Sequence, residues 1–273
     1  MYTKECLPLV DLTAKLSPSI VSTLQLSLQQ FGAFRLVAPQ LTGNLSQRVM
    51  QDARGFFQLP IDVKSRSKGY SALGTELVLG RTAIPKESIY FFQNGGDDCT
   101  PPPSDLQNYI KEFHNEWTKF RNELFNTVST ILGSTVPLTG TPALDHETVA
   151  VNFYDSDNLS LEKAQFCPPH KDGGTLTILV RNSNAGDGLE IADLRSTEKL
   201  DSEGIGREAS FISIPAVENE VIVLAGTGSQ RLLGKDKIRA CVHRVSRPVQ
   251  TGAKQERLSL AIFCGPPIKS INS

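Results

Sequence analysis

Two of the four histidines in this sequence belong to a pattern that could bind a metal ion. His170 and Asp172 lie two residues apart in HKDGGTLTILVR, which predicts a β-strand. Residues two apart in an extended segment point to the same face, so both side chains could converge. His243 lies in the strand-like run CVHRVS and could bring a second imidazole to them from a neighbouring strand.

This set of two imidazoles and one carboxylate would occupy one face of an octahedral metal ion and leave three positions open. Such an arrangement is typical of non-haem Fe(II) oxygenases. The alternative is a pair of partly buried, hydrogen-bonded histidines, and these three residues alone do not decide between the two. His114 and Glu116 repeat the spacing on a predicted helix, where they point in different directions and cannot share a metal. His114 and His146 therefore receive no functional role.

A second candidate pair follows on a later predicted strand. Arg257 and Ser259 alternate there with Leu258 and Leu260, which places the guanidinium and the hydroxyl on one face. A planar guanidinium can bind a carboxylate through two hydrogen bonds, and the hydroxyl can add a third. We therefore expect an anionic organic ligand beside the metal, unless Arg257 lies on an edge strand and pairs with a surface carboxylate.

The elements that must position these residues change character near residue 148. Before it, apolar spacing of three and four residues predicts helices over 18–31, 41–57 and 109–131, with short strands at 7–12 and 33–37. After it, period-two runs predict an antiparallel sandwich or barrel; these runs are TVAVNFY, GTLTILVR, ASFISIP, EVIVLAG, CVHRVS and RLSLAIFCG. Residues 64–106 are expected to be irregular, with a lid or pocket function, and residues 192–209 to form a polar loop between two strands.

Composition limits the classes of partner. The 273 residues include 28 Lys and Arg against 29 Asp and Glu, so no basic excess favours nucleic acid or an anionic membrane. No apolar stretch is long enough to span a membrane, and the N-terminus does not resemble a signal peptide. Five scattered cysteines without a Cys-x-x-Cys motif indicate neither a disulfide framework nor a zinc site. We expect a soluble, cytoplasmic monomer or homodimer that acts on a small molecule.

The motifs together resemble one enzyme family. HKDGGTLTILV, CVHRVSRP and RLSLAIFCGPP match, in order, the signature segments of the isopenicillin N synthase-like Fe(II)/2-oxoglutarate-dependent dioxygenases. Upstream segments extend the resemblance over nearly the whole chain; they are LPLVDLT, QQFGAFRLVA, FFQLPIDVKSR, KGYSALGTE, IPKESIYFF and VAVNFYDSD.

The resemblance implies an α+β, mainly β fold: a double-stranded β-helix (jelly-roll) core with a helical N-terminal region. Residues 1–106 would form the N-terminal helical and irregular region, and residues 107–273 the long helix and the catalytic core, in one compact unit. The resemblance further implies that His170, Asp172 and His243 bind Fe(II), with O₂ as co-substrate. The residues implied to bind the cosubstrate 2-oxoglutarate are Arg257 and Ser259 at its distal carboxylate, Tyr154 through its phenol, and Asn152 near the metal-chelating end.

The sequence departs from the family pattern at three places. The interval between Asp172 and His243 is longer than usual, and residues 192–209 account for the excess. The segment that usually reads Asn-x-Gly-Asp before the distal histidine is here Leu224–Thr227. The chain stops soon after Ser259, so we expect either an unusually open site or one that is closed by residues 64–106 and 192–209 or by a neighbouring subunit.

The activity implied is oxidation of a C–H bond in a small organic molecule, and we expect an amino acid or a secondary metabolite. Hydroxylation, desaturation and cyclisation are all open to such an oxidant. An apolar substrate pocket is expected, and its proposed wall residues are Tyr70, Phe91, Phe92 and Leu189. The alternatives are an iron oxidase of the same fold that does not use 2-oxoglutarate, and a non-catalytic ligand-binding module.

Overall fold

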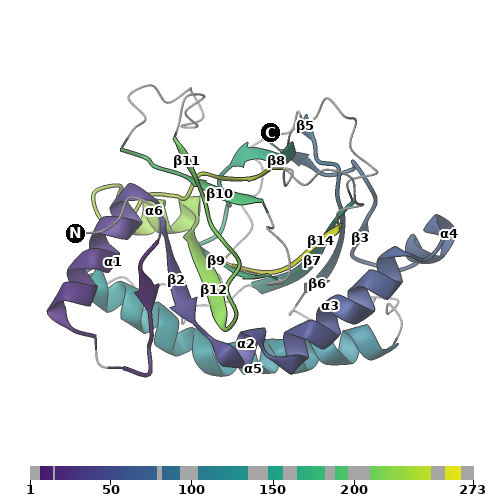
Figure 1. Ribbon diagram of the computed structural model, residues 1–273, viewed down its shortest axis with the longest axis horizontal. Helices are drawn as coiled ribbons and strands as arrows, with labels where there is room; N and C mark the ends of the chain where they lie inside the picture. Colours follow the sequence, from purple (N-terminus) through teal and green to yellow (C-terminus); the bar gives the residue numbers. More distant parts are fainter. Residues whose placement is uncertain are drawn as a thin grey trace.

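The computed structural model describes residues 7–14, 16–78, 82–92, 104–134, 147–155, 165–181, 188–195, 210–246 and 256–265. Within them two β-sheets face each other, and helices cover the outer face of the larger sheet (Figure 1). The helices are α1 (Pro18–Gln30), α2 (Pro39–Thr42), α3 (Asn44–Phe57), α4 (Ile61–Lys64), α5 (Ser104–Ile131) and α6 (Thr227–Leu233).

The larger sheet contains eight strands. In spatial order they are β1 (Leu9–Val10), β2 (Ala33–Val37), β12 (Glu220–Ala225), β9 (Leu176–Arg181), β14 (Glu256–Cys264), β7 (Glu147–Asp155), β6 (Glu87–Phe92) and β3 (Tyr70–Ser71). The pairs are antiparallel except for β1 with β2. The first half of the chain therefore supplies both ends of the sheet, and the second half supplies the four central strands.

The smaller sheet contains β11 (Phe211–Ser213), β10 (Leu189–Ala192), β13 (His243–Ser246) and β8 (Gln165–His170), in that order. β4 (Leu77–Val78) and β5 (Thr82–Ala83) form a separate antiparallel pair, and β4 packs against β8 of the smaller sheet. In Figure 1, β8, β10 and β11 lie on one side of the larger sheet, while α3 and α5 lie on the other.

The central strands of the larger sheet are buried on both faces, and their residues alternate between two environments. On β7, Val149, Val151 and Phe153 pack into the hydrophobic core beneath the helices. Asn152 and Tyr154, which alternate with them, line a cavity between the two sheets. The period-two pattern of the sequence thus separates a core face from a polar interior face.

The predicted helices are present, with one interruption. α1 begins where Ser17 accepts a hydrogen bond from the backbone of Ile20 and Pro18 occupies the first turn. Gly32, just beyond its end, has φ +66°, and a Cβ there would lie 2.2 Å from the carbonyl oxygen of Arg239. The helix predicted over 41–57 is divided at Gly43 into α2 and α3.

The strand predictions from residue 148 onward correspond to β7, β9, β11, β12, β13 and β14. Six further strands of the described residues were not expected: β8 and β10 here, and β3, β4, β5 and β6 before residue 148. β8 contains Pro168 and Pro169, which argue against a strand in sequence alone. β10 has only four residues, and β6 lies in the segment predicted to be irregular. The loop predicted at 192–209 does connect two strands, β10 and β11, but residues 196–209 lie outside the described residues.

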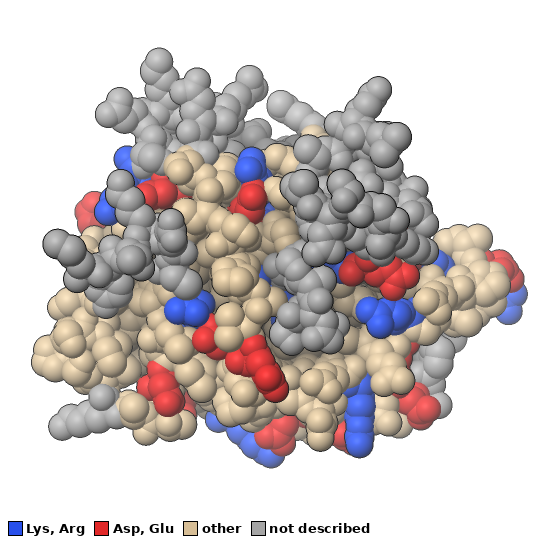
Figure 2. All heavy atoms as spheres, viewed as in Figure 1, with Lys and Arg blue, Asp and Glu red and all other residues tan. Residues whose placement is uncertain are grey.

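The described surface carries charges of both signs. On the face shown in Figure 2, Lys and Arg are interspersed with Asp and Glu, as the near-zero net charge predicts. None of the described helices combines the length and the hydrophobicity that a membrane span requires.

Candidate metal and cosubstrate site

Three side chains with metal-binding atoms converge between the two sheets. His170 ends β8, His243 begins β13, and the two are direct partners in the register of these strands. Oδ1 of Asp172 lies 3.7 Å from Nε2 of His170 and 3.8 Å from Nε2 of His243. One ligand atom from each residue lies within 4.8 Å of the other two. The structure thus brings together the three residues that the sequence singled out.

The reason for the convergence differs from the expected one. Asp172 is not on a strand with His170, because β8 ends at His170 and β9 begins at Leu176. The carboxylate instead comes from the turn between two strands that belong to different sheets. Asp172 thus lies just beyond a strand and not within one, while its predicted convergence with His170 is observed.

Hydrogen bonds orient two of the three side chains through the atoms that point away from the site. Nδ1 of His170 lies 2.9 Å from the carbonyl oxygen of Pro168. A carbonyl can only accept, so Nδ1 carries a proton, and Nε2 is the atom that coordinates a metal ion once it has lost its own proton. Thr177 donates to Oδ2 of Asp172 at 2.6 Å, which turns Oδ1 toward the imidazoles.

The backbone of the Asp172 turn is held by the segment after β12. Thr227 donates its N–H to the carbonyl of Asp172 at 2.8 Å, and Gly226 donates to Thr175 at 2.8 Å. A Cβ on Gly226 would lie 2.1 Å from the carbonyl oxygen of Gly174, so only glycine permits this approach. The segment Leu224–Thr227 thus positions the turn through its backbone.

The electrostatic environment keeps the carboxylate charged. Burial raises the pKa of Asp172, but the two histidines and the Thr177 hydrogen bond outweigh it and hold that pKa below its usual range. Burial and the charge of His170 lower the pKa of His243 to about 4. Burial also acts to lower the pKa of His170, but Cys167, Asp172 and the Pro168 carbonyl outweigh it and raise that pKa to about 9. An ionised Asp172 and a neutral His243 are the forms that coordinate a cation.

The convergent residues line a cavity of about 280 Å³ that also contains the predicted carboxylate-binding residues. On β14, Arg257 and Ser259 lie opposite Tyr154 and Asn152 of β7. Nη1 of Arg257 lies 3.1 Å from Oγ of Ser259, and its guanidinium carbon lies 5.0 Å from the centre of the Tyr154 ring. Arg257 is only 6% exposed. Its buried guanidinium therefore lines the same cavity as His170, Asp172 and His243.

Several residues of this cavity were not predicted. Lys86 donates to Oδ1 of Asn152 at 2.7 Å and to Oε2 of Glu76 at 2.8 Å, and Ser88 donates to the same Asn152 oxygen at 2.9 Å. Tyr90 also lines the cavity. Lys86, Ser88 and Tyr90 alternate in PKESIYFF, and this period-two pattern could have predicted that their side chains share one face of a strand. No comparable local pattern predicts a role for Glu76 or Thr177.

The expected substrate wall is only partly present. Leu189 lines the cavity. Tyr70 and Phe91 instead pack against the hydrophobic core on the opposite face of the larger sheet, and Tyr70 donates to Glu87 there. Phe91 was assigned to the wrong face of its strand. It pairs with the core residue Val149, and the neighbouring residue Tyr90 points to the opposite face and lines the cavity. Phe92 ends β6, but its side chain lies outside the described residues.

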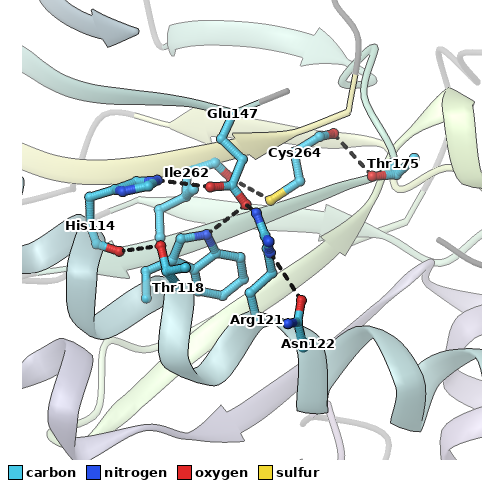
Figure 3. Close-up of polar contacts among 9 residues, drawn as sticks. His114, Thr118, Arg121, Asn122, Glu147, Thr175, Ile262 and Cys264 are labelled. Atoms are coloured by element: carbon cyan, nitrogen blue, oxygen red, sulfur yellow. Dashed lines mark hydrogen bonds and ion pairs between the residues drawn. The ribbon is translucent and has the colours of Figure 1, made fainter. Parts of the chain in front are cut away.

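His114, which received no role, belongs to a separate buried cluster beneath the larger sheet. Its Nε2 lies 2.8 Å from Oε2 of Glu147, while Trp117 and Arg121 donate to Oε1 at 2.9 and 3.1 Å (Figure 3). All three partners project from one side of α5, and Glu147 begins β7. This cluster connects a helix to the sheet and lies away from the cavity. His146, the remaining histidine, is outside the described residues.

Comparison with known proteins identifies the family. The model of the 2OG-Fe(II) oxygenase superfamily matches residues 146–266, which include all three convergent side chains and the Arg257–Ser259 pair. The part of the chain that carries the site thus matches the 2OG-Fe(II) oxygenase superfamily. Jasmonate-induced oxygenase 4 of Arabidopsis thaliana is 25% identical over 91% of this chain and 69% of its own. Thebaine 6-O-demethylase of Papaver somniferum is 24% identical over 98% of this chain and 73% of its own.

The fold agrees with this assignment. The solved structure of dioxygenase for auxin oxidation 1 from Arabidopsis thaliana, in a binary complex with 2-oxoglutarate, superposes with a TM-score of 0.71 at 18% identity, covering 97% of this chain and 94% of that one. The expected jelly-roll fold and the resemblance seen in the sequence are thereby confirmed. As a 2OG-Fe(II) oxygenase, the protein is an oxidoreductase whose cofactors are Fe(II), 2-oxoglutarate and O₂. The donor set of two imidazole nitrogens and one carboxylate oxygen fits Fe(II).

Proposed function

We propose that the protein couples the oxidative decarboxylation of 2-oxoglutarate to the oxidation of a C–H bond in a small organic molecule. In this proposal His170, Asp172 and His243 hold Fe(II), and Arg257 with Ser259 holds the distal carboxylate of 2-oxoglutarate. The observation that carries the proposal is that both groups line a single cavity of about 280 Å³. For hydroxylation, O₂, 2-oxoglutarate and the substrate C–H give succinate, CO₂ and the alcohol.

The residues of the chain bind and orient the reactants. Arg257 offers paired N–H donors from a buried position, where a charge-assisted hydrogen bond is strong. Asn152 has its carbonyl oxygen occupied by Lys86 and Ser88, so its amide N–H₂ is the group it can offer to 2-oxoglutarate. Tyr154 can donate its phenol, because burial raises its pKa and keeps it protonated. When bound, Fe(II) supplies the redox chemistry that links O₂ to both oxidations.

The substrate is proposed to be an amino acid or a secondary metabolite. The cavity adds the apolar residues Leu77, Val78 and Ile84 to its polar groups, as a pocket for a small organic molecule requires. A relative whose name states the demethylation of thebaine acts on such a metabolite. Hydroxylation, desaturation and cyclisation differ only in how the substrate C–H bond is presented.

We also propose that the protein acts in the cytoplasm as a monomer or homodimer. Cys167, Cys241 and Cys264 are buried free thiols, which favour a reducing compartment.

A titration of the anaerobic protein with Fe(II) and 2-oxoglutarate tests the assignment of the site. The wild-type protein is expected to develop the visible charge-transfer band of the 2-oxoglutarate chelate, and His170→Ala is expected to lose both this band and substrate-linked succinate formation. His114→Ala is the matched control, because its imidazole contacts Glu147 beneath the sheet, and it should keep the band. Succinate formation by His170→Ala at saturating iron would show that His170 is not a ligand. A wild-type protein without the band would contradict the use of 2-oxoglutarate.

A further inference from the structure

We propose that Lys86 binds the substrate through a carbonyl oxygen and that Glu76, by neutralising its charge, selects uncharged substrates over carboxylates. This inference rests on the proposed function, because it assigns the part of the cavity that the metal ligands and the Arg257–Ser259 pair do not use. Lys86 precedes β6 and Glu76 precedes β4, and both side chains line the cavity. Lys86 also holds the side-chain oxygen of Asn152, but its bond to Glu76 is not part of that contact.

The ion pair consists of a buried Lys86 and a partly buried Glu76, so part of its attraction is offset by the loss of hydration. The side chain of Lys86 is 9% exposed and that of Glu76 is 21% exposed. Removing two charges from water costs several kcal/mol per ion, and their mutual attraction often fails to repay it. A buried ion pair is therefore weak evidence for stability, whereas its place in the wall of the cavity indicates a ligand.

The hydrogen bonds of Lys86 show how many of its donors remain available to a ligand. Its ammonium group carries three donors. One is directed to Oδ1 of Asn152 at 2.7 Å and one to Oε2 of Glu76 at 2.8 Å. Within the described part of the chain no third acceptor bonds to it, so one donor remains for an oxygen atom of a bound molecule. The required ligand group is a hydrogen-bond acceptor.

The charge of Glu76 decides which acceptor fits. Although burial raises it, the pKa of Glu76 is lowered by the charge of Lys86 and by their hydrogen bond, so Glu76 is ionised at neutral pH. A substrate carboxylate beside Lys86 would also lie close to this negative charge, and the repulsion offsets the attraction to the ammonium. A carbonyl oxygen accepts the same hydrogen bond without that cost. An ammonium group cannot accept this bond, and repulsion by Lys86 offsets its attraction to Glu76.

Three probes of one shape can measure this selectivity: cyclohexanecarboxamide, cyclohexanecarboxylate and cyclohexylmethylamine. Their dissociation constants are measured by ligand-observed NMR titration of protein loaded with Zn(II), which is redox-inert, and 2-oxoglutarate. The wild-type protein is expected to bind the carboxamide most tightly. Glu76→Gln leaves the charge of Lys86 uncompensated and should shift the ratio of carboxylate to carboxamide affinity at least tenfold toward the carboxylate, which is about 1.4 kcal/mol.

Glu190→Gln is the matched control, because Glu190 also pairs with a cation, Arg244, and its side chain is 22% exposed, but it does not line the cavity. It should leave the ranking unchanged. Lys86→Gln is a second test that does not depend on how well Glu76→Gln folds, and it should shift the ranking toward the amine. A preference of the wild-type protein for the carboxylate, or an unchanged ranking in both variants, would overturn the inference. Failure of the wild-type protein to bind 2-oxoglutarate in the same titration would instead overturn the proposed function.

Discussion

Thr177 contacts neither of the two imidazoles, yet it determines which oxygen of Asp172 faces them. Its hydroxyl donates to Oδ2 at 2.6 Å, and Oδ1 is the atom that lies near both Nε2 atoms. Groups that orient metal ligands contribute strongly to metal affinity, because an unconstrained ligand must be ordered on binding. Thr177 is therefore a positioning residue in the proposed site.

For Thr177→Val, which keeps the shape of the side chain and removes the hydroxyl, we expect metal affinity to fall about 10- to 100-fold. Thr177→Ser retains the donor and should restore most of the affinity. Competition with a metallochromic chelator measures both variants, and circular dichroism checks that each is folded. Equal metal affinity in Thr177→Val and the wild-type protein would show that Asp172 needs no such support.

The contacts of Arg257 require a planar guanidinium, which a lysine side chain does not have. Its guanidinium is buried, contacts Ser259 and lies over the ring of Tyr154, an arrangement that a single ammonium cannot reproduce. For Arg257→Lys we expect the KM for 2-oxoglutarate to rise about 10- to 100-fold, since one charge-assisted hydrogen bond contributes about 1.5–3 kcal/mol. Ser259→Ala should raise it less. Succinate formation at varied 2-oxoglutarate gives both values, and an unchanged KM in Arg257→Lys would assign Arg257 to another ligand.

At the scale of elements, Glu147 connects β7 to α5. The carboxylate is almost completely buried and accepts from Trp117 and Arg121, with His114 at its other oxygen (Figure 3). Burial raises the pKa of Glu147, but the hydrogen bonds from His114 and Trp117 and the charge of Arg121 outweigh it and lower that pKa. The helix and the first long strand of the core are thus joined by an ionised group.

For Glu147→Gln we expect the free energy of unfolding at pH 7 to fall by about 2–4 kcal/mol, because three donors lose a charged acceptor. A carboxyl whose folded-state pKa is lowered stabilises the protein above its unfolded pKa, about 4.3, and loses this contribution as the pH falls through the folded value. The difference between the two proteins should therefore shrink below about pH 4. Urea unfolding at successive pH values measures it, with Glu123→Gln on the exposed side of α5 as control. A difference that stays constant with pH would contradict an ionised Glu147.

Alternation along strands explains why part of the site was predictable. Arg257, Ser259, Tyr154 and Asn152 each alternate with core residues on a long strand, so their common face follows from the sequence. Lys86 could have been found from the alternation in PKESIYFF, whereas Glu76 and Thr177 carry no comparable local pattern. β8 was missed because its two prolines oppose strand formation, although that strand ends at His170. Its edge position in the smaller sheet removes the physical objection, since proline is tolerated on edge strands.

At the scale of the whole molecule, the two halves of the chain are interleaved in one sheet. β1 and β2 extend one side of the four central strands, and β6 and β3 extend the other. The long helix α5 packs with α3 against the core face of these central strands. Removing either half would expose strand edges and the apolar face, so neither half has a complete core of its own.

We therefore expect the chain to unfold in one cooperative transition. Trp117, the single tryptophan, reports on the contact of α5 with β7, while the charge-transfer band of bound 2-oxoglutarate reports on the cavity between the sheets. Fluorescence, circular dichroism and loss of the band should share one urea midpoint, and Glu147→Gln should move all three by the same amount, because all follow the same equilibrium. A fluorescence transition that precedes loss of the band would show that the helices separate from a sheet that remains folded, and that the interleaved strands do not couple the two halves.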